Sequence, residues 1–427
     1  MRPNVSERIV EQDLCIGCGM CDAICPVNVL KMDFNDIGNY QPFESEGCLD
    51  KCTLCLDVCP FISDNEDEKQ IAEKLYGSVE NVQYDDNLGY FLKTYEIHKK
   101  DNEERLKSAS GGAGNCFLKQ LFDTNTVDYV LTVEANNNSD KLFKFSVFDN
   151  SFDLGRTRGS VYYPTEMSEV LDYVMKNDGR YAITVLPCFA TAIRLAQGKN
   201  HKLRKRIKVV IGLVCGQMKS KFFTEELGKI AHRKGRLSKV EYRVKQPDKP
   251  ANEYAFRFTD EAGEKSSLTW SSAPEKFWSS RMFTPNACNT CTDVFALNAD
   301  FVLMDAWLPE YKPDYRGHTL VIVRTNEIDN LIVNAAGIAI KEINYNTVYE
   351  SQKNVVLNKN SYVYGHKNYF LNKITTYRKK IQQLSNDNYE NNKKSIENVF
   401  TKIKYAFYLY RVFRKAYQIA SRLKGKQ

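Results

Sequence analysis

Eight cysteines between positions 15 and 59 form two motifs that each end in Cys-Pro. In each motif three cysteines are separated by two or three residues, and the fourth follows after three more residues. Three closely spaced thiolates wrap one face of an iron–sulfur cubane, and the cysteine before proline reaches the other cubane. This rule assigns one [4Fe–4S] cluster to Cys15, Cys18, Cys21 and Cys59 (the first cysteine set). It assigns another to Cys25, Cys48, Cys52 and Cys55 (the second cysteine set).

Zinc coordination is the alternative interpretation of this segment. Zinc sites prefer two pairs of ligands, and a repeated Cys-Pro ending has no role in them, so two clusters are favoured. The motifs differ at one point, because three residues rather than two separate Cys48 from Cys52. The extra residue widens the loop around the second cluster without removing a ligand. Gly17 and Gly19 are expected to bring the backbone close to the first cluster and to turn its amides toward the sulfurs.

Four of the other five cysteines have the number and placement for a third cluster. Cys188 and Cys215 each end an apolar, strand-like run, while Cys288 and Cys291 form a close pair in a polar loop. A cubane needs four thiolates, but a single free cysteine is more often a small buried hydrophobe. Spacing alone leaves both interpretations open. Cys116 lies inside a helix-like run and is expected to pack in the core.

A turn rich in serine and glycine, Ser-Ala-Ser-Gly-Gly-Ala-Gly at 108–114, directly precedes an apolar helix-like run. Its amides and hydroxyls suit a phosphate or pyrophosphate, although such turns also serve close packing. The sequence contains no Ser/His/Asp triad and no Walker loop. Among the five histidines, His318 precedes an apolar run and is a candidate proton donor, whereas most of the histidines are expected at the surface.

The elements that must position these residues alternate between strand-like and helix-like runs. The strand-like runs are 128–135, 141–148, 181–186, 208–215, 300–307 and 319–325, and the clearest helix-like runs are 166–177 and 220–234. This alternation predicts an α/β domain with a mixed, partly parallel sheet. The expected order is an α+β ferredoxin-like 2[4Fe–4S] domain (1–62), a linker with or without a short helix (63–88), the α/β domain (89–345) and a helical C-terminal region (346–427).

Composition and charge indicate a soluble protein and limit its expected location and partners. The 427 residues are 43% hydrophobic with a mean hydropathy of −0.47, which is typical of a soluble globular protein. No apolar run is long enough to span a bilayer, and the N-terminus lacks the apolar core of a signal peptide, so a cytoplasmic location is expected. Residues 361–427 carry 15 Lys and Arg against 3 Asp and Glu. This basic, aromatic tail is expected either to pack on the body or to touch a membrane surface or a membrane-bound partner. Nucleic-acid binding is not favoured, because no recognised module accompanies the charge.

Five blocks of sequence, in order, resemble the coenzyme F420 hydrogenase/dehydrogenase beta-subunit family, in its form with a fused N-terminal ferredoxin. The blocks are SASGGAGNCFLKQLF (108–122), GRTRGSVYYP (155–164), VLPCFATAIR (185–194), IGLVCG (211–216) and ACNTCTDVFALNADFVLMDAW (287–307). The resemblance covers roughly residues 10–340. This chain has Val-Leu-Pro-Cys at 185–188 where relatives have Gly-Thr-Pro-Cys, and Cys-Gly-Gln at 215–217 where many relatives place a charged or histidine residue nearby. These departures bear on the substrate rather than on the fold.

The resemblance implies that the α/β domain binds FAD and a [4Fe–4S] cluster. It places the third cluster on Cys188, Cys215, Cys288 and Cys291 (the third cysteine set). It places FAD near Ser108, Ser110, Gly111, Gly112, Arg158, Gly159 and Ser160. Asp305 matches a position that could orient a ligand or support the fold.

The implied function is an oxidoreductase that moves electrons from ferredoxin or a partner subunit through the clusters to FAD. The final acceptor is an organic molecule such as coenzyme F420 or another small molecule, and some similar sequences are associated with polysaccharide biosynthesis. Two alternatives remain at this point. One is a non-catalytic electron-transfer subunit of a larger redox complex, and the other is a zinc-stabilised scaffold protein.

Overall fold

The structure is a computed structural model that describes residues 4–138, 140–232, 235–247 and 249–364. The basic helical tail expected beyond residue 364 lies outside the described residues, as does its expected membrane contact. Among the described residues, no helix has both the length and the apolar character needed to cross a membrane.

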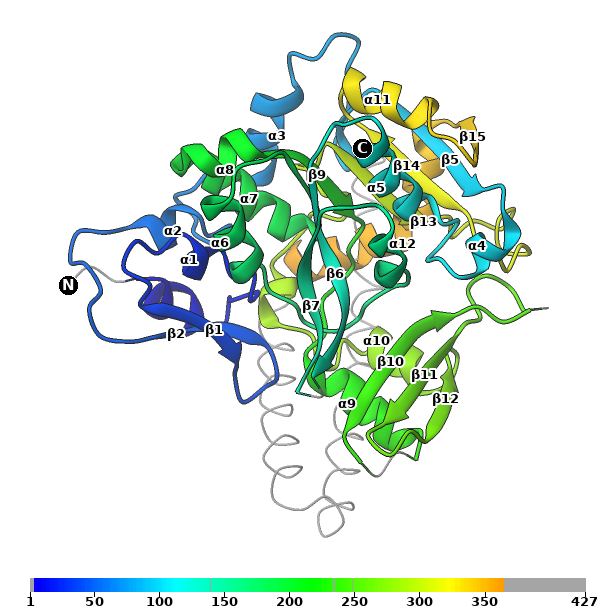
Figure 1. Ribbon diagram of the computed structural model, residues 1–427, viewed down its shortest axis with the longest axis horizontal. Coiled ribbons are helices and arrows are strands. Elements are labelled where there is room, and N and C mark those ends of the chain that lie inside the picture. The colour runs from blue at the N-terminus through cyan, green and yellow to red at the C-terminus, as the bar shows by residue number, and fades with distance from the viewer. Residues whose placement is uncertain (1–3, 139, 233–234, 248, 365–427) are drawn as a thin grey trace, which may run out of the picture.

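A mixed sheet of eight strands forms the centre of the molecule (Figure 1). Its strands are β5 (Lys93–Lys99), β6 (Tyr129–Asn138), β7 (Lys141–Phe148), β8 (Tyr181–Val185), β9 (Ile207–Leu213), β13 (Phe301–Asp305), β14 (Thr319–Val323) and β15 (Ile338–Glu342). They lie in the order β15-β5-β14-β13-β9-β8-β6-β7. The four strands β13, β9, β8 and β6 are parallel neighbours, and the pairs on either side of them are antiparallel. The predicted α/β domain with a mixed sheet is therefore confirmed.

Helices cover both faces of this sheet. One face packs against α5 (Ala113–Asp123) and α11 (Asn326–Val333). The other packs against α6 (Ser168–Lys176), α7 (Pro187–Lys199), α8 (His201–Arg206) and α12 (Tyr345–Tyr364). Both faces of strand β14 are buried under helices. Leu320 and Ile322 face one helical layer, while Val321 and Val323 face the other, which explains why the strand is apolar along its length.

Residues 4–62 form a small ferredoxin-like unit, drawn in blue at the left of Figure 1. Its elements are η1 (Ser6–Val10), α1 (Met20–Ala23), β1 (Leu30–Phe34), β2 (Tyr40–Glu44) and α2 (Leu54–Asp57). The unit packs directly on the start of α6, where the Met167 amide donates to the Cys18 carbonyl at 3.0 Å. Gly19 permits this contact, because a Cβ there would lie 2.4 Å from the Glu166 carboxylate and its φ is +81°. The two parts consequently share one hydrophobic core.

The predicted linker, 63–88, is mostly ordered against the body. Its helix α3 (Glu68–Tyr76) begins at a capping box on Asp67. The buried Tyr76 hydroxyl donates to Asp300 at 3.1 Å, which ties α3 to the start of β13. A short hairpin of β3 (Gln83–Asp85) and β4 (Gly89–Phe91) then leads into the main sheet, and α4 (Asn102–Leu106) follows β5.

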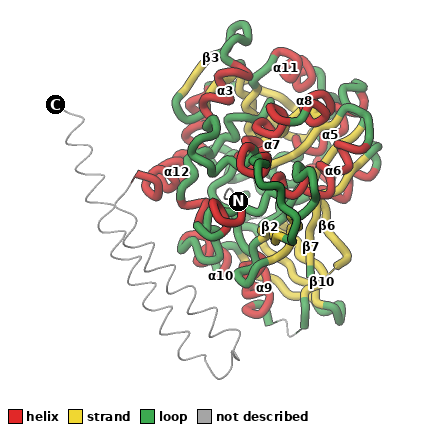
Figure 2. The backbone as a smooth tube through the Cα atoms, turned by 90° about the vertical axis from the view of Figure 1, so that its left-hand side faces the viewer, coloured by secondary structure: helices red, strands yellow, loops and turns green. Residues whose placement is uncertain are grey.

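A second, smaller sheet was not anticipated from the sequence. Strands β10 (Leu237–Val244), β11 (Ala255–Asp260) and β12 (Lys265–Thr269) are antiparallel and pack with α9 (Lys221–Ile230) and α10 (Ala273–Ser279). Figure 2 shows β10 beside the ends of β6 and β7. The core of this small lobe is largely aromatic, with Phe223, Tyr242, Phe256 and Phe258 buried in it.

Candidate functional site

The structure brings the second cysteine set together around one pocket. All four of its cysteines line the same small hollow, together with apolar neighbours that include Val29 and Leu54. The cysteines are half-buried, and two rim residues, Val27 and Leu49, expose 38% and 48% of their surface. The pocket therefore lies close to solvent.

The first cysteine set lies deeper. Burial raises the pKa of the Cys21 thiol, and the next contributions come from Cys18, Cys15 and Cys59, the other three members of the set. Burial likewise raises the pKa of Cys15 to about 11, although the Gly17 amide, which donates to its Sγ at 3.4 Å, opposes the rise. Buried thiols grouped in this way ionise only when a cation offsets their mutual repulsion, and metal coordination supplies that cation. The donor set fits an iron–sulfur cluster.

Parallel strands assemble the third cysteine set. The neighbours β8 and β9 are parallel, so their carboxyl ends meet at one edge of the sheet. Cys188 lies in the first turn of α7, just past the end of β8, and Cys215 lies just past the end of β9. The 3-10 turn η3 (Asn286–Asn289) brings Cys288 and Cys291 to the same edge. All four line one pocket.

Two nitrogen donors from other parts of the chain contact the sulfurs of this inner pocket. The Met218 amide donates to Cys288 Sγ at 3.4 Å, and Lys359 Nζ donates to Cys291 Sγ at 3.1 Å. Lys359 belongs to α12 and is 3% exposed, so its charge is held against the thiols. Burial raises the pKa of Cys188, and Cys291, Cys215 and Cys288 add to the rise. The donor set fits a third cluster for the same reason as the first.

Two residues of the ferredoxin-like unit also line the inner pocket. Ile16 stands between Cys15 and Cys18, and Phe61 follows the second Cys-Pro motif. Ile16, the direct neighbour of Cys15 in the chain, thus joins the first cysteine set to the pocket of the third. Distance along the chain gave no indication of this proximity.

A large cavity opens beside the inner pocket. It has a volume of about 610 Å³, which lies within the range of small-molecule sites. Its aromatic lining includes Phe189 of α7, Trp278 of α10 and four loop residues: Tyr162, Tyr254, Trp270 and Trp307. Cys215, Gln217 and Met218 line both the cavity and the inner pocket. We call this space the aromatic cavity.

The residues that the resemblance placed around FAD divide into two groups. Ser110, Gly112, Gly159 and Ser160 line the aromatic cavity, with Gly112 as the N-cap of α5. Ser108, Gly111 and Arg158 do not line it. The Ser108 hydroxyl donates to the Glu104 carbonyl, Arg158 forms a two-pronged ion pair with Glu104, and Gly111 packs so tightly that a Cβ would lie 2.7 Å from the Ile97 carbonyl oxygen.

One polar atom in the aromatic cavity has no partner among the described residues. Thr184 Oγ1 is buried, lines the cavity at the end of β8 and forms no hydrogen bond with any of them. A buried hydroxyl without a partner costs about 1–3 kcal/mol. A polar group of a bound molecule would satisfy it. Together with the glycine-rich start of α5 and the aromatic walls, this atom makes the cavity a good fit for a flavin nucleotide.

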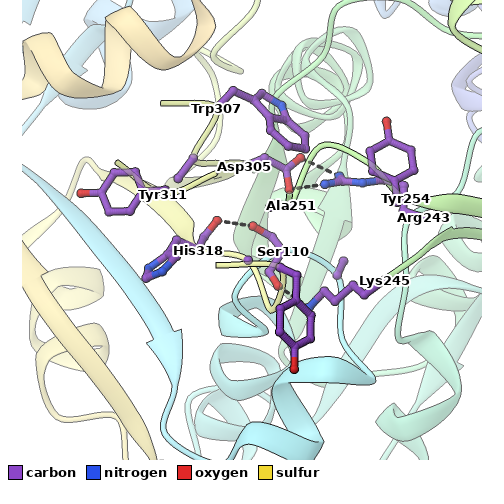
Figure 3. A pocket seen from close by; sticks show the side chains of 13 residues that line it. Ser110, Arg243, Lys245, Ala251, Tyr254, Asp305, Trp307, Tyr311 and His318 are labelled. Atoms are coloured by element: carbon purple, nitrogen blue, oxygen red, sulfur yellow. Dashed lines mark hydrogen bonds and ion pairs between the residues drawn. The ribbon is translucent and has the colours of Figure 1, made fainter. Parts of the chain in front are cut away.

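Figure 3 shows a small side pocket that joins the aromatic cavity at Ser110, Tyr254 and Trp307. Asp305 accepts two hydrogen bonds from the Arg243 guanidinium, both at 2.6 Å, so it supports the wall between the two sheets. Lys245 Nζ donates to three carbonyls, including that of Ser110 at 2.7 Å, and so holds the serine–glycine turn. Burial lowers the pKa of Lys245 to about 7, and the nearby Arg243 and Arg105 add to this effect.

Sequence reasoning missed most of this cavity. Arg243, Lys245, Trp270 and Trp278 come from the small lobe and the loops around it, and no motif marks them. The alternation of apolar and polar residues in β10 and β11 could have indicated strands. No sequence motif around Lys359 indicates that it contacts the third cysteine set. Cys116 lies in α5, half-buried beside the hydrophobic core, and lines neither the aromatic cavity nor any cysteine pocket, as expected for a packing residue.

Comparison with protein families matches three profiles in succession. Residues 14–62 match a 4Fe–4S dicluster domain. Residues 94–172 match the N-terminal part of the coenzyme F420 hydrogenase/dehydrogenase beta subunit, and residues 178–345 match its C terminus. The two beta-subunit profiles together match more than half of the chain. Helix α12, which carries Lys359, lies almost entirely beyond them.

Individual relatives are distant. A subunit of the F(420)H(2) dehydrogenase of Methanosarcina mazei is 26% identical over 222 residues, 50% of this chain and 56% of that protein. The coenzyme F420-dependent sulfite reductase of Methanocaldococcus jannaschii is 24% identical over 357 residues, 78% of this chain and 48% of that protein. The chain thus spans about half the length of these curated relatives. A chain of the F420-reducing [NiFe] hydrogenase complex of Methanosarcina barkeri has a similar fold, with a TM-score of 0.50 at 18% identity, covering 65% of this chain and 93% of that one.

A 4Fe–4S dicluster domain joined to an α/β domain with a large mixed sheet defines an iron–sulfur redox protein. The chain belongs to the coenzyme F420 hydrogenase/dehydrogenase beta-subunit family, in the form with a fused N-terminal ferredoxin domain.

Proposed function

We propose that this protein is an FAD-dependent iron–sulfur oxidoreductase that passes electrons between a redox partner and an organic acceptor. One observation carries the proposal. Cys215, Gln217 and Met218 line both the inner cysteine pocket and the aromatic cavity, so a cluster and a flavin bound there would be neighbours. Ile16 and Phe61 join the same inner pocket to the ferredoxin-like unit. The result is a continuous series of sites from the protein surface to the cavity.

The chain's own residues have three tasks in this proposal. The first, second and third cysteine sets would each hold a [4Fe–4S] cluster, with the second set nearest to solvent and to a ferredoxin or partner subunit. The start of α5 and the Thr184 hydroxyl would bind the polar parts of FAD, and the aromatic walls would exclude water from its ring. When bound, FAD supplies the exchange between single electrons and the electron pair of a hydride.

The acceptor is proposed by class. Two relatives carry F420 in their names, and a deazaflavin would suit a cavity with aromatic walls and cationic groups such as Lys219 and Arg243. Another small organic molecule, including one from polysaccharide biosynthesis, would use the same surfaces.

Anaerobic purification followed by cofactor analysis tests the proposal. The expected result is about one FAD per chain, reduced when electrons are supplied by dithionite-reduced ferredoxin. A protein that shows no flavin absorbance and binds no added FAD would sink the enzyme proposal and leave a non-catalytic electron-transfer subunit. Zinc without visible iron–sulfur absorbance would instead favour a scaffold.

A single substitution tests the flavin position. Thr184→Val keeps the shape of the side chain and removes its unpartnered hydroxyl. The loss of one hydrogen bond, about 1 kcal/mol, should raise the dissociation constant of FAD about fivefold. Thr124→Val, at an exposed position after α5, is the matched control and should leave FAD affinity unchanged. Equal affinities in the two variants would remove Thr184 from the flavin site.

A further inference from the structure

Three side chains away from the cysteine sets meet on one face of the main sheet. Glu96 and His98 are two residues apart on β5, so their side chains point to the same side. Thr319 pairs with Ile97 in the antiparallel ladder, which places His318 opposite His98. The two imidazole rings lie 4.8 Å apart between centroids. The backbone therefore gathers the three residues without any unusual geometry.

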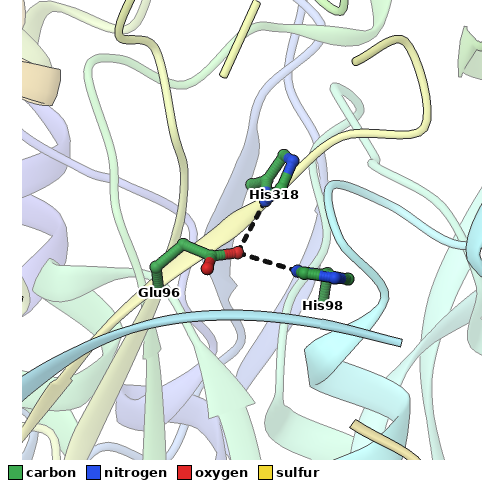
Figure 4. Close-up of side chains that lie close together, drawn as sticks. All are labelled: Glu96, His98 and His318. Atoms are coloured by element: carbon green, nitrogen blue, oxygen red, sulfur yellow. Dashed lines mark hydrogen bonds and ion pairs between the residues drawn. The ribbon is translucent and has the colours of Figure 1, made fainter. Parts of the chain in front are cut away.

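The nitrogens of both histidines point at one carboxylate oxygen. Figure 4 shows the Glu96 carboxylate between the two rings. Glu96 Oε1 lies 2.6 Å from His318 Nδ1 and 2.9 Å from His98 Nδ1. One ligand atom from each of the three residues lies within 4.8 Å of the other two. The Glu96 side chain is only 8% exposed, and those of His318 and His98 are 14% and 25% exposed.

His318 meets a carboxylate at each of its ring nitrogens. Its Nε2 lies 3.2 Å from Asp314 Oδ2, while its Nδ1 faces Glu96. A neutral imidazole has one N–H, so it can donate to only one of these acceptors. The other nitrogen needs a positive charge beside it, either a second proton or a metal ion. With Nε2–H donating to Asp314, the free ligand atom is Nδ1, the atom that faces Glu96 and His98.

We propose that Glu96, His98 and His318 form a binding site for a divalent transition-metal ion, with Zn²⁺ as the favoured ion. Two imidazoles and one carboxylate are a common zinc donor set, and three protein ligands leave a fourth position for water or a bound molecule. The Asp314–His318 contact has the form of the carboxylate that orients a metal-binding histidine. The proposal is independent of FAD and of the clusters.

The observed spacing allows the ion to enter with small movements. Ligand atoms about 2.0 Å from a tetrahedral zinc lie about 3.3 Å from one another. The two nitrogen–oxygen separations seen here are shorter than that. Entry of the ion would therefore lengthen these two separations by about half an ångström and bring the two histidine ligand atoms, which lie within 4.8 Å of each other, closer together. His318 also lines the side pocket next to Tyr311, so the fourth position is within reach of that pocket.

The test uses the full-length protein with its clusters in place. Protein dialysed against EDTA is titrated anaerobically with Zn²⁺, desalted, and assayed for zinc and iron in the same sample. The wild type should take up one zinc per chain without losing iron, and its zinc X-ray absorption should show nitrogen and oxygen neighbours without sulfur. His98→Gln and Glu96→Gln should bind zinc at least about tenfold more weakly. His201→Gln, an exposed histidine on α8, is the control and should match the wild type.

Two results would overturn the proposal. One is a wild type that takes up no zinc, which would mean that a proton holds His318 between the two carboxylates. The other is zinc with sulfur neighbours, or zinc uptake that is equal in His98→Gln and the wild type, which would place the ion at cysteines. Unchanged iron content in each variant shows that the fold is intact, so a folding defect cannot produce the expected result.

Discussion

The second and third cysteine sets each contain four cysteines, but the chain builds the two sets in different ways. The second set comes from loops and the short helix α2 near the surface, and its rim includes the exposed residues Val27 and Leu49. The third set comes from the ends of β8 and β9 and from η3, and α12 and the ferredoxin-like unit cover it. The two ways of building a site match two different requirements of electron transfer. One site must be reachable by a partner, and the other must be held in a fixed, dry position beside a cavity.

The largest expected effect is on the third set. Cys288→Ser removes one of its four thiolates, and the purified protein should contain about four fewer iron atoms per chain, roughly eight in place of twelve. Iron and sulfide assays on anaerobically purified protein measure this. Cys116→Ser, in α5 and outside all three sets, should leave the iron content unchanged. Equal iron in both variants would mean that the inner pocket does not hold a cluster.

The contact between the two regions should be sensitive to packing. Ile16 is 6% exposed and lies between the first set and the inner pocket. Ile16→Ala leaves a cavity there and should lower the free energy of unfolding by about 2–4 kcal/mol, which lowers the apparent melting temperature by roughly 2–5 °C in a chain of this length. Val27→Ala, on the exposed rim of the second set, is the control and should change the apparent melting temperature by at most about 1 °C. Thermal unfolding under anaerobic conditions compares them.

The reduction potential of a cluster in the inner pocket should depend on a buried charge, whereas no Lys or Arg is among the described residues that line the pocket of the second set. Lys359 Nζ donates to Cys291 Sγ, and a buried cation favours the reduced, more negative state of a cluster bound there. Lys359→Met should lower that cluster's reduction potential by about 50–100 mV, equivalent to about 1–2 kcal/mol. Lys353→Met removes an exposed lysine of the same helix, which pairs with Glu350, and should leave the potential in place. A redox titration followed by electron paramagnetic resonance would measure both.

The smallest effect is expected at the surface. Leu49→Asp places a charge on the rim of the second set, and the rate of electron uptake from reduced ferredoxin should fall roughly two- to tenfold. Iron content should not change, because Leu49 supplies no ligand. Leu75→Asp, an exposed leucine on α3, is the control for added charge. If the two variants take up electrons at the same rate, the partner docks elsewhere.

Much of the architecture could be predicted from local patterns. The strand-like runs at 141–148 and 319–325 correspond to β7 and β14, because apolar runs of this length have few alternatives to a buried strand. The helix predicted at 166–177 is α6. The three-stranded sheet of the small lobe was missed, since its strands contain charged residues on one face and no motif marks its turns, although the helix predicted at 220–234 corresponds to α9. The membership of the third set rested on a family resemblance, because sequence spacing leaves the positions of distant strands open.

Local sequence was sufficient to define the ferredoxin-like unit. Three cysteines two or three residues apart can reach one cluster through local backbone geometry, and the cysteine before proline in the other motif completes it, so the paired motifs predict the grouping of the first and second sets. It took tertiary packing to bring Cys188 and Cys215 to the same edge as Cys288 and Cys291, to place Lys359 against them and to open the aromatic cavity alongside. Parallel strand pairing decides these contacts, and pairing depends on packing between segments far apart in the chain. The same kind of long-range pairing, between β5 and β14, brought His318 to Glu96 and His98.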